Sequence, residues 1–272
     1  MSVRVAAIQM VSKPAVEDNL RDARALIAAA AAQGAELVAL PEYFCLMGLQ
    51  ETDKLAVREP DGDGPVQRFL ATQARTHGIW LVGGTAPLAD PGGERVRNSV
   101  LVYDPQGHRV ARYDKIHLFA FSRGEESYDE ARTIAPGSEV VTFNLPAHDG
   151  LLYRVGLSVC YDLRFPELYR AMGQPDLILV PAAFTATTGQ AHWLTLLKAR
   201  AIENLCYVLA PAQGGLHDNG RSTFGHSALI DPWGGVVAQR DSGPGVVIGE
   251  LDPQLVQSVR QSLPALQHRV LG

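Results

Sequence analysis

The chain has 272 residues, of which 46% are apolar and 19% charged, and its formal net charge at pH 7 is −5. This composition is typical of a folded globular protein and excludes a largely disordered chain. Lys and Arg are scattered rather than clustered, which argues against a nucleic-acid-binding surface.

The N-terminal part of the chain alternates between strand-like and helix-like segments. Two amphipathic helices are predicted, and each lies between two short apolar runs. Gly34 and Gly78 follow these helices, where glycine is a common terminating residue. The successive predicted segments are residues 3–10, 16–30, 36–40, 66–74 and 79–84. This order is that of two β-α-β units in succession.

The middle and the C-terminal part mix hairpins with further α/β units. Residues 97–115 contain two β-rich runs around a turn at 104–107, which predicts an antiparallel hairpin. The later predicted segments are strands at 151–159, 176–181, 205–212 and 245–252, helices at 166–172 and 192–204, and a hairpin within 225–239. Together they predict an α/β protein with mixed sheets, and we expect a single domain over residues 1–272.

Four reactive side chains lie at or near the ends of these segments, where functional groups gather in open α/β sheets. They are Glu42, Lys115, Cys160 and Glu130, the last in the loop before residues 131–141. Taken singly, the three charges are typical of solvated loops and the thiol is typical of a small buried side chain. Taken together, a carboxylate, an ammonium and a thiol are the groups that acyl transfer by a nucleophilic cysteine requires.

Three segments resemble the signature segments of the nitrilase superfamily of carbon–nitrogen hydrolases. They are LPEYF, YDKIHLF and CYDLRFPELYR, and the resemblance extends over nearly the whole chain. It implies that Glu42 is the general base, Lys115 the cation that stabilises the oxyanion, and Cys160 the nucleophile. It also implies a four-layer α-β-β-α sandwich with two mixed β-sheets, assembled as a homodimer or a larger homo-oligomer.

The same resemblance suggests a second glutamate. The segment SYDEARTIAPG is similar to the region that carries it in the family and places Glu130 at the matching position. Glu125 and Glu126 are alternatives in the same acidic stretch, and the downstream TIAPG favours Glu130. The backbone N–H of Tyr161 is expected to join Lys115 in stabilising the oxyanion.

The implied reaction is hydrolysis of an amide through a cysteine thioester, with release of ammonia and without a metal or an organic cofactor. The C-terminal half resembles the branch that contains deaminated glutathione amidase and omega-amidase, which acts on 2-oxoglutaramate or 2-oxosuccinamate. The segments APAQ and GRSTFGHS favour the former. Both kinds of substrate carry carboxylates, so basic residues should face the pocket. The expected substrate-binding residues are Arg164, Phe184, Thr185, His192 and Arg221.

Other interpretations of the sequence remain open. A catalytically silent family member that acts as a binding protein is one, and a dinucleotide enzyme is another, although VGGTAP lacks the G-x-G-x-x-G pattern. Cys45, Cys160 and Cys206 have neither disulfide-framework nor zinc-ligand spacing, so a free thiol is expected. No segment has the length of a signal core or a membrane span. We therefore expect a cytoplasmic protein whose partner is a small amide, with no nucleic acid and no membrane.

Overall fold

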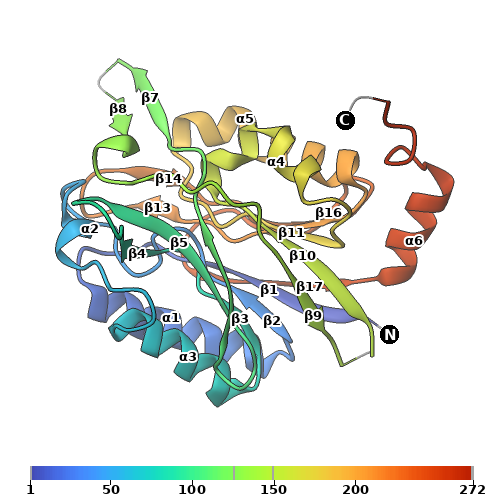
Figure 1. Ribbon diagram of the computed structural model, residues 1–272, viewed down its shortest axis with the longest axis horizontal. Coiled ribbons are helices and arrows are strands. Elements are labelled where there is room, and N and C mark those ends of the chain that lie inside the picture. The colour runs from blue at the N-terminus through green and yellow to red at the C-terminus, as the bar shows by residue number, and fades with distance from the viewer. Residues whose placement is uncertain (1, 125, 149, 271–272) are drawn as a thin grey trace.

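The structure is a computed structural model that describes residues 2–124, 126–148 and 150–270. Two β-sheets lie face to face in its centre (Figure 1). Helices α1 (Val16–Ala32) and α3 (Pro65–His77) cover the outer face of one sheet. Helices α4 (Pro166–Ala171) and α5 (Ala186–Asn204) cover the outer face of the other. This arrangement confirms the predicted α-β-β-α sandwich.

The first sheet is built by the N-terminal half and completed by a C-terminal strand. Its strand order is β17-β1-β2-β3-β5-β4, with β6 paired to β5. The strands β1, β2 and β3 are parallel, and the other pairings are antiparallel. Their bounds are β1 Val3–Gln9, β2 Leu37–Ala39, β3 Trp80–Val82, β4 Ala86–Ala89, β5 Val96–Tyr103, β6 Arg109–Asp114 and β17 Gly245–Leu251. The predicted hairpin at 97–115 is the pair β5 and β6.

The second sheet has the order β16-β15-β12-β11-β10-β9 and is also mixed. Its strands β10, β11 and β12 are parallel, and the remaining pairs are antiparallel. The bounds are β9 Thr142–Pro146, β10 Leu152–Leu157, β11 Leu177–Leu179, β12 Tyr207–Ala210, β15 Ser227–Ile230 and β16 Val236–Arg240. In each sheet the C-terminal ends of the three parallel strands lie side by side. The loops that follow these strands meet at one end of the sandwich.

The alternation along β1 shows how the layers are packed. Val5 and Ala7 belong to the apolar cluster between the two sheets, whereas Ala6 and Ile8 belong to the cluster under α1 and α3. Successive side chains of a strand point to opposite faces, so a strand covered on both faces is apolar throughout. This is why residues 3–10 read as a continuous apolar run.

Helix ends follow local sequence signals. Helix α3 has a proline in its first turn and ends at Gly78, whose φ of 62° is the left-handed conformation that glycine adopts at little cost. Helix α5 begins six residues before the predicted start, because the Oγ1 of Thr185 accepts a hydrogen bond from the backbone N–H of Thr188 and caps it.

Several short elements escape sequence prediction. They are the ribbons β7 Ala120–Arg123 with β8 Glu126–Asp129 and β13 Gly214–Leu216 with β14 Ser222–Phe224, the helices α2 Asp53–Ala56 and α6 Pro253–Ser262, and the 3₁₀ helices η1 Glu130–Arg132 and η2 Cys160–Arg164. Glu130 thus lies in a 3₁₀ helix rather than in the predicted loop. Within the described ranges, every helix is too short or too polar to cross a bilayer.

Candidate active site

The four reactive residues named from the sequence come from both sheets and meet at one end of the sandwich. Glu42 follows β2, Lys115 directly follows β6, Cys160 follows β10, and Glu130 begins η1. Their exposed fractions are 1% for Glu42, 0% for Lys115, and 7% for both Glu130 and Cys160. Isolated buried charges are costly, so these groups need close partners.

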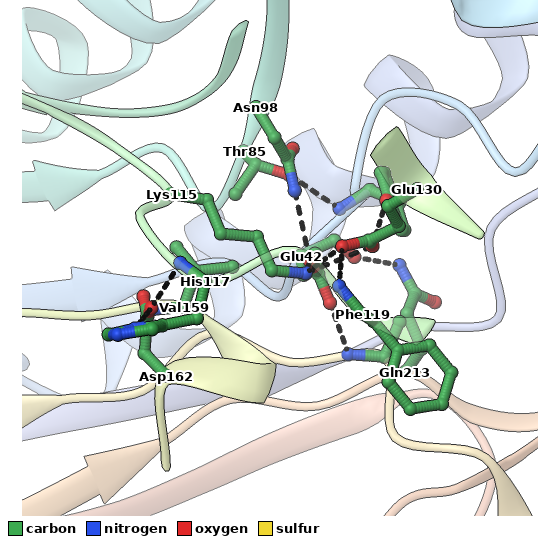
Figure 2. Close-up of polar contacts among 12 residues, drawn as sticks. Glu42, Thr85, Asn98, Lys115, His117, Phe119, Glu130, Val159, Asp162 and Gln213 are labelled. Carbon is green, nitrogen blue, oxygen red and sulfur yellow. Dashed lines mark hydrogen bonds and ion pairs between the residues drawn. The ribbon is translucent and has the colours of Figure 1, made fainter. Parts of the chain in front are cut away.

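Lys115 is the centre of the cluster (Figure 2). Its Nζ donates to Oε1 of Glu42 at 2.9 Å, and to Oε1 and Oε2 of Glu130 at 2.9 and 2.8 Å. Burial would lower the pKa of Lys115, but the charges of Glu130 and Glu42 outweigh it and raise that pKa. Burial likewise opposes ionisation of Glu130, yet Lys115 brings its pKa below the ordinary value. At neutral pH the cluster therefore contains a lysine cation and a Glu130 anion.

Neutral donors fix the Glu42 carboxylate. Its Oε1 accepts from Nδ2 of Asn98 at 2.9 Å, and its Oε2 accepts from the backbone N–H of Ala183 at 2.9 Å. The backbone carbonyl of Glu42 accepts from Nε2 of Gln213 at 3.0 Å. The carboxylate is therefore held by both sheets, since Asn98 lies on β5 and Ala183 follows β11.

Two donors fix Glu130 in a similar way. The hydroxyl of Tyr43 donates to Oε1 at 2.7 Å, and the backbone N–H of Phe119 donates to Oε2 at 2.7 Å. Tyr43 itself has a φ of 57°, a left-handed backbone conformation that is strained for a tyrosine. Its backbone N–H donates to Oγ1 of Thr85 at 2.9 Å, which helps to hold that turn (Figure 2).

Cys160 occupies a second strained turn. Its φ is 49°, and its backbone N–H donates to the carbonyl of Pro181 at 2.9 Å. Burial, and next the charge of Glu42, raise the pKa of the Cys160 thiol well above its ordinary value, and Lys115 opposes this only in part. The resting group is therefore a thiol. Tyr161 lies in the first turn of η2, where backbone N–H groups lack acceptors inside the helix.

A small pocket opens above Cys160. Its lining consists of Phe119, Glu130, Cys160, Tyr161, Arg164, Ala183, Phe184, Thr185, Thr188 and Arg221. The pocket thus brings together the thiol, one carboxylate of the cluster, the first turn of η2 and two guanidinium groups. Aromatic rings enclose it, since Tyr161 makes edge contacts with Phe119 and Phe165.

The two arginines form no ion pair with a carboxylate within the described ranges. The Arg164 guanidinium lies over the rings of Tyr161 and Phe184, at 5.6 and 5.3 Å from their centres. Arg221 donates from Nη2 to the carbonyl of Ala183 at 2.9 Å, while its buried Nε has no hydrogen-bond partner among the described residues. In the part of the chain that the structure describes, two guanidinium cations without a carboxylate partner therefore face the pocket, an arrangement suited to an anionic ligand.

The remaining predicted residues lie close to this pocket. Phe184 is buried against Trp193, with ring centres 4.8 Å apart, and Thr185 is a buried pocket residue that caps α5. His192 is an exposed residue of α5 outside the pocket lining, and its Nδ1 is 3.3 Å from Nη1 of Arg164. Of the alternatives to Glu130, Glu125 lies outside the described residues and Glu126 begins β8.

Sequence reasoning missed the residues that hold the cluster in place. They are Tyr43, Thr85, Asn98, Phe119, Ala183 and Gln213. Only two had a usable signal, since Tyr43 follows Glu42 directly and Asn98 faces Lys115 across the predicted hairpin. All three cysteines are free and buried, and no group of three or more potential metal ligands occurs among the described residues.

Comparison with known proteins identifies the family of this chain. Residues 4–261 match the family model of carbon-nitrogen hydrolases. The chain is 43% identical over 269 residues to a deaminated glutathione amidase of Synechocystis sp. (strain PCC 6803 / GT-S), and the match covers 97% of each protein.

Two solved structures are similar over nearly all of this chain. The NitFhit protein of C. elegans superposes with a TM-score of 0.88 at 37% identity, covering 99% of this chain and 65% of that one. Nit3 of Saccharomyces cerevisiae, a member of branch 10 of the nitrilase superfamily, has a TM-score of 0.88 at 29% identity, covering 99% and 97%.

Proposed function

Because the chain belongs to the carbon–nitrogen hydrolase family, we propose that it hydrolyses deaminated glutathione through a thioester on Cys160. One observation carries the proposal: the Cys160 thiol lies in a pocket beside the Glu42–Lys115–Glu130 cluster. Arg164 and Arg221, which form no ion pair among the described residues, face the same pocket. Similarity to a deaminated glutathione amidase over 97% of both chains supports this choice of substrate.

In the first half of the proposed reaction, Cys160 is acylated. A carboxylate oxygen of Glu42 takes the thiol proton while Sγ attacks the amide carbon. The carbonyl oxygen becomes an oxyanion, which Nζ of Lys115 and the backbone N–H of Tyr161 stabilise. Glu42 then gives the proton to the amide nitrogen, the C–N bond breaks, and an amine leaves a thioester on Cys160.

In the second half, water replaces the amine. Glu42 takes a proton from the water molecule while the water oxygen attacks the thioester carbon. Nζ of Lys115 and the backbone N–H of Tyr161 again stabilise the oxyanion. The C–S bond breaks, the carboxylic acid leaves, and the proton returns to Sγ. Glu130 keeps Lys115 charged and in place throughout, through its two short contacts with Nζ.

The nature of the leaving group changes one product expected from the sequence. Ammonia is released only from a primary amide such as 2-oxoglutaramate. In deaminated glutathione the amide nitrogen belongs to the cysteine residue, so the leaving amine is cysteinylglycine. The acyl part is 2-oxoglutaryl in both cases. The rate of 2-oxoglutarate formation therefore measures the hydrolysis of both substrates. The rate of ammonia release measures only the hydrolysis of 2-oxoglutaramate.

The test is a side-by-side measurement of kcat/KM on deaminated glutathione, 2-oxoglutaramate, succinamate and a simple nitrile. We expect deaminated glutathione to exceed 2-oxoglutaramate by roughly tenfold or more, because it adds leaving-group contacts and a second carboxylate. A preference for 2-oxoglutaramate would make the protein an omega-amidase. Lack of hydrolysis of every substrate by folded protein would favour the silent binding protein.

Arg164 and Arg221 provide a prediction about substrate binding. Replacing either with methionine should raise KM or lower kcat/KM for deaminated glutathione by roughly 10- to 100-fold, since a hydrogen bond to a charged group contributes about 1.5–3 kcal/mol. Steady-state kinetics test this, with Arg21→Met, an exposed arginine of α1, as the control. Unchanged KM and kcat in both pocket variants would remove these residues from substrate binding.

A cytoplasmic location and a homodimer are also part of the proposal. Three buried, unpaired thiols are typical of a reducing compartment. Trp233, Val236, Val237 and Ile202 are exposed apolar residues, a kind of surface that commonly forms subunit contacts. Light scattering after gel filtration should give twice the monomer mass of 29.3 kDa.

A further inference from the structure

Asp162 is a fully buried carboxylate two residues after Cys160. Its Oδ1 accepts from the backbone N–H of His117 at 3.0 Å and lies 2.7 Å from Nδ1 of the same residue. Its Oδ2 accepts from the hydroxyl of Tyr113 at 2.6 Å and from the backbone N–H of Val159 at 2.8 Å. These four contacts use the acceptor capacity of the carboxylate, and they explain how a buried charge is tolerated without Lys or Arg.

The partners of Asp162 come from the two segments that carry the reactive groups. Tyr113 and His117 lie two residues before and two residues after Lys115, whereas Val159 directly precedes Cys160. Alternate residues of an extended chain point the same way. Asp162 therefore bridges the lysine segment at both of its flanks and joins it to the turn of the nucleophile (Figure 2 shows the contacts with His117 and Val159).

The bridge joins segments that belong to different sheets. The backbone of Lys115 is hydrogen-bonded to Asn98 of the first sheet, at 3.0 Å, and that of Cys160 to Pro181 of the second, at 2.9 Å. The two sheets also pack against each other through an apolar cluster. Apolar contacts are non-directional, whereas buried hydrogen bonds with four fixed partners define a relative position.

The same carboxylate also stabilises the turn itself. The carboxylate accepts a hydrogen bond from the backbone N–H of Val159. The backbone N–H of Asp162 in turn donates to the Val159 carbonyl at 3.0 Å, and the two bonds close the turn around Cys160. Cys160 needs this support because its φ of 49° costs a non-glycine residue on the order of 1–2 kcal/mol.

We propose that Asp162 is a positioning residue of the reaction, which holds Lys115 in register with the Cys160 thiol by tying their segments together. The proposal rests on the function proposed above, in that it takes Lys115 and Cys160 as the reacting pair. Asp162 does not touch the substrate pocket, whose lining does not include it. Its effect is therefore on the rate of attack rather than on the binding of the amide.

A matched pair of tyrosines tests this. Tyr113 and Tyr169 are both fully buried, and each donates one hydroxyl hydrogen bond, to Asp162 and to Ser158 respectively. Loss of the bond to the Asp162 carboxylate should cost about 1.5–3 kcal/mol of stability, and loss of the bond to the Ser158 hydroxyl about 1 kcal/mol. Only Tyr113→Phe removes a contact of the Asp162 bridge, which then holds the lysine segment through His117 alone. It should lower kcat and the rate of Cys160 alkylation by iodoacetamide by roughly tenfold with KM unchanged, whereas Tyr169→Phe should stay within about twofold of wild type.

Asp162→Asn should have a larger effect. It replaces one carboxylate oxygen with an NH₂ group, which cannot accept the hydrogen bonds that this oxygen receives. If Asp162→Asn does not fold, the kcat and the alkylation rate of Tyr113→Phe test the proposal. Equal alkylation rates and kcat in wild type and Tyr113→Phe, or equal losses in both tyrosine variants, would overturn the proposal. Alkylation needs no substrate, so it remains decisive for Asp162 even if wild type fails to hydrolyse deaminated glutathione, a result that would count only against the proposed function.

Discussion

Replacing Cys160 with alanine is expected to lower kcat/KM for amide hydrolysis by roughly 10⁴-fold or more, because the variant can form no thioester. The fold should persist. Cys160 has a small side chain that is 7% exposed. Alanine removes only the sulfur and should disturb the surrounding packing little. Steady-state formation of 2-oxoglutarate measures the activity, and thermal unfolding shows whether the variant is folded.

Cys206→Ala is the matched control for this loss. Cys206 is also fully buried, and burial raises the pKa of its thiol, but it lies before β12 outside the pocket. We expect this control to lose some stability and to keep kcat/KM within about twofold. Hydrolysis at the wild-type rate in folded Cys160→Ala would exclude the thioester route.

Replacing Lys115 with methionine should have the second large effect, on both activity and stability. The change leaves the carboxylates of Glu42 and Glu130 buried and next to each other without their shared cation. Breaking a buried ion pair by removing one partner costs about 3–5 kcal/mol. Loss of the oxyanion donor should lower kcat by roughly 10²- to 10³-fold in addition. Urea unfolding and kinetics measure the two effects separately.

The pH dependence of this stability loss identifies its cause. In wild type the pKa of Glu130 is lowered from 4.5, so its stabilising contribution is present above that pH and is lost as pH falls through the folded pKa. In Lys115→Met, burial without a cation should raise the pKa of the Glu130 carboxyl above its unfolded value. Stability of the variant should then increase as pH falls from about 7 to about 5, while wild type gains none from this cluster.

A surface lysine supplies the control for that comparison. Lys13 pairs with Asp22 and its side chain is 43% exposed, so Lys13→Met should change stability by less than about 1 kcal/mol and leave kcat unchanged. If Lys115→Met unfolds at the same urea concentration as wild type at neutral pH, the buried cluster does not contribute as described.

Much of the fold follows from local signals along the chain. The 3.6-residue period of α1 and α3, the left-handed Gly78 and the turn at 104–107 each depend on residues close in sequence. Apolar runs such as 3–10 indicate strands buried on both faces, from which a layered α/β architecture follows. The elements that escape prediction are short. The ribbons β7–β8 and β13–β14 are local hairpins whose strands have only three or four residues, too few for a clear alternation of apolar and polar side chains.

The candidate site was only partly predictable, because contacts between distant parts of the chain hold it in place. Glu42, Lys115, Glu130 and Cys160 were found because their chemistry and their motifs are visible in the sequence, although each alone has an ordinary explanation. Most of the residues that hold them were not visible in the sequence. Ala183 contributes a backbone N–H, which carries no side-chain signal, and Asp162 acquires its partners Tyr113 and His117 only when the two sheets pack together.

The most direct test of the account is the mass of the peptide that carries Cys160 when turnover of deaminated glutathione is stopped with acid at successive times, beginning before the steady state. The account predicts a peptide heavier by one 2-oxoglutaryl group, bound as a thioester, and the same added mass with 2-oxoglutaramate because both substrates share this acyl part. A Cys160 peptide that keeps its unmodified mass at every time while 2-oxoglutarate accumulates would contradict it.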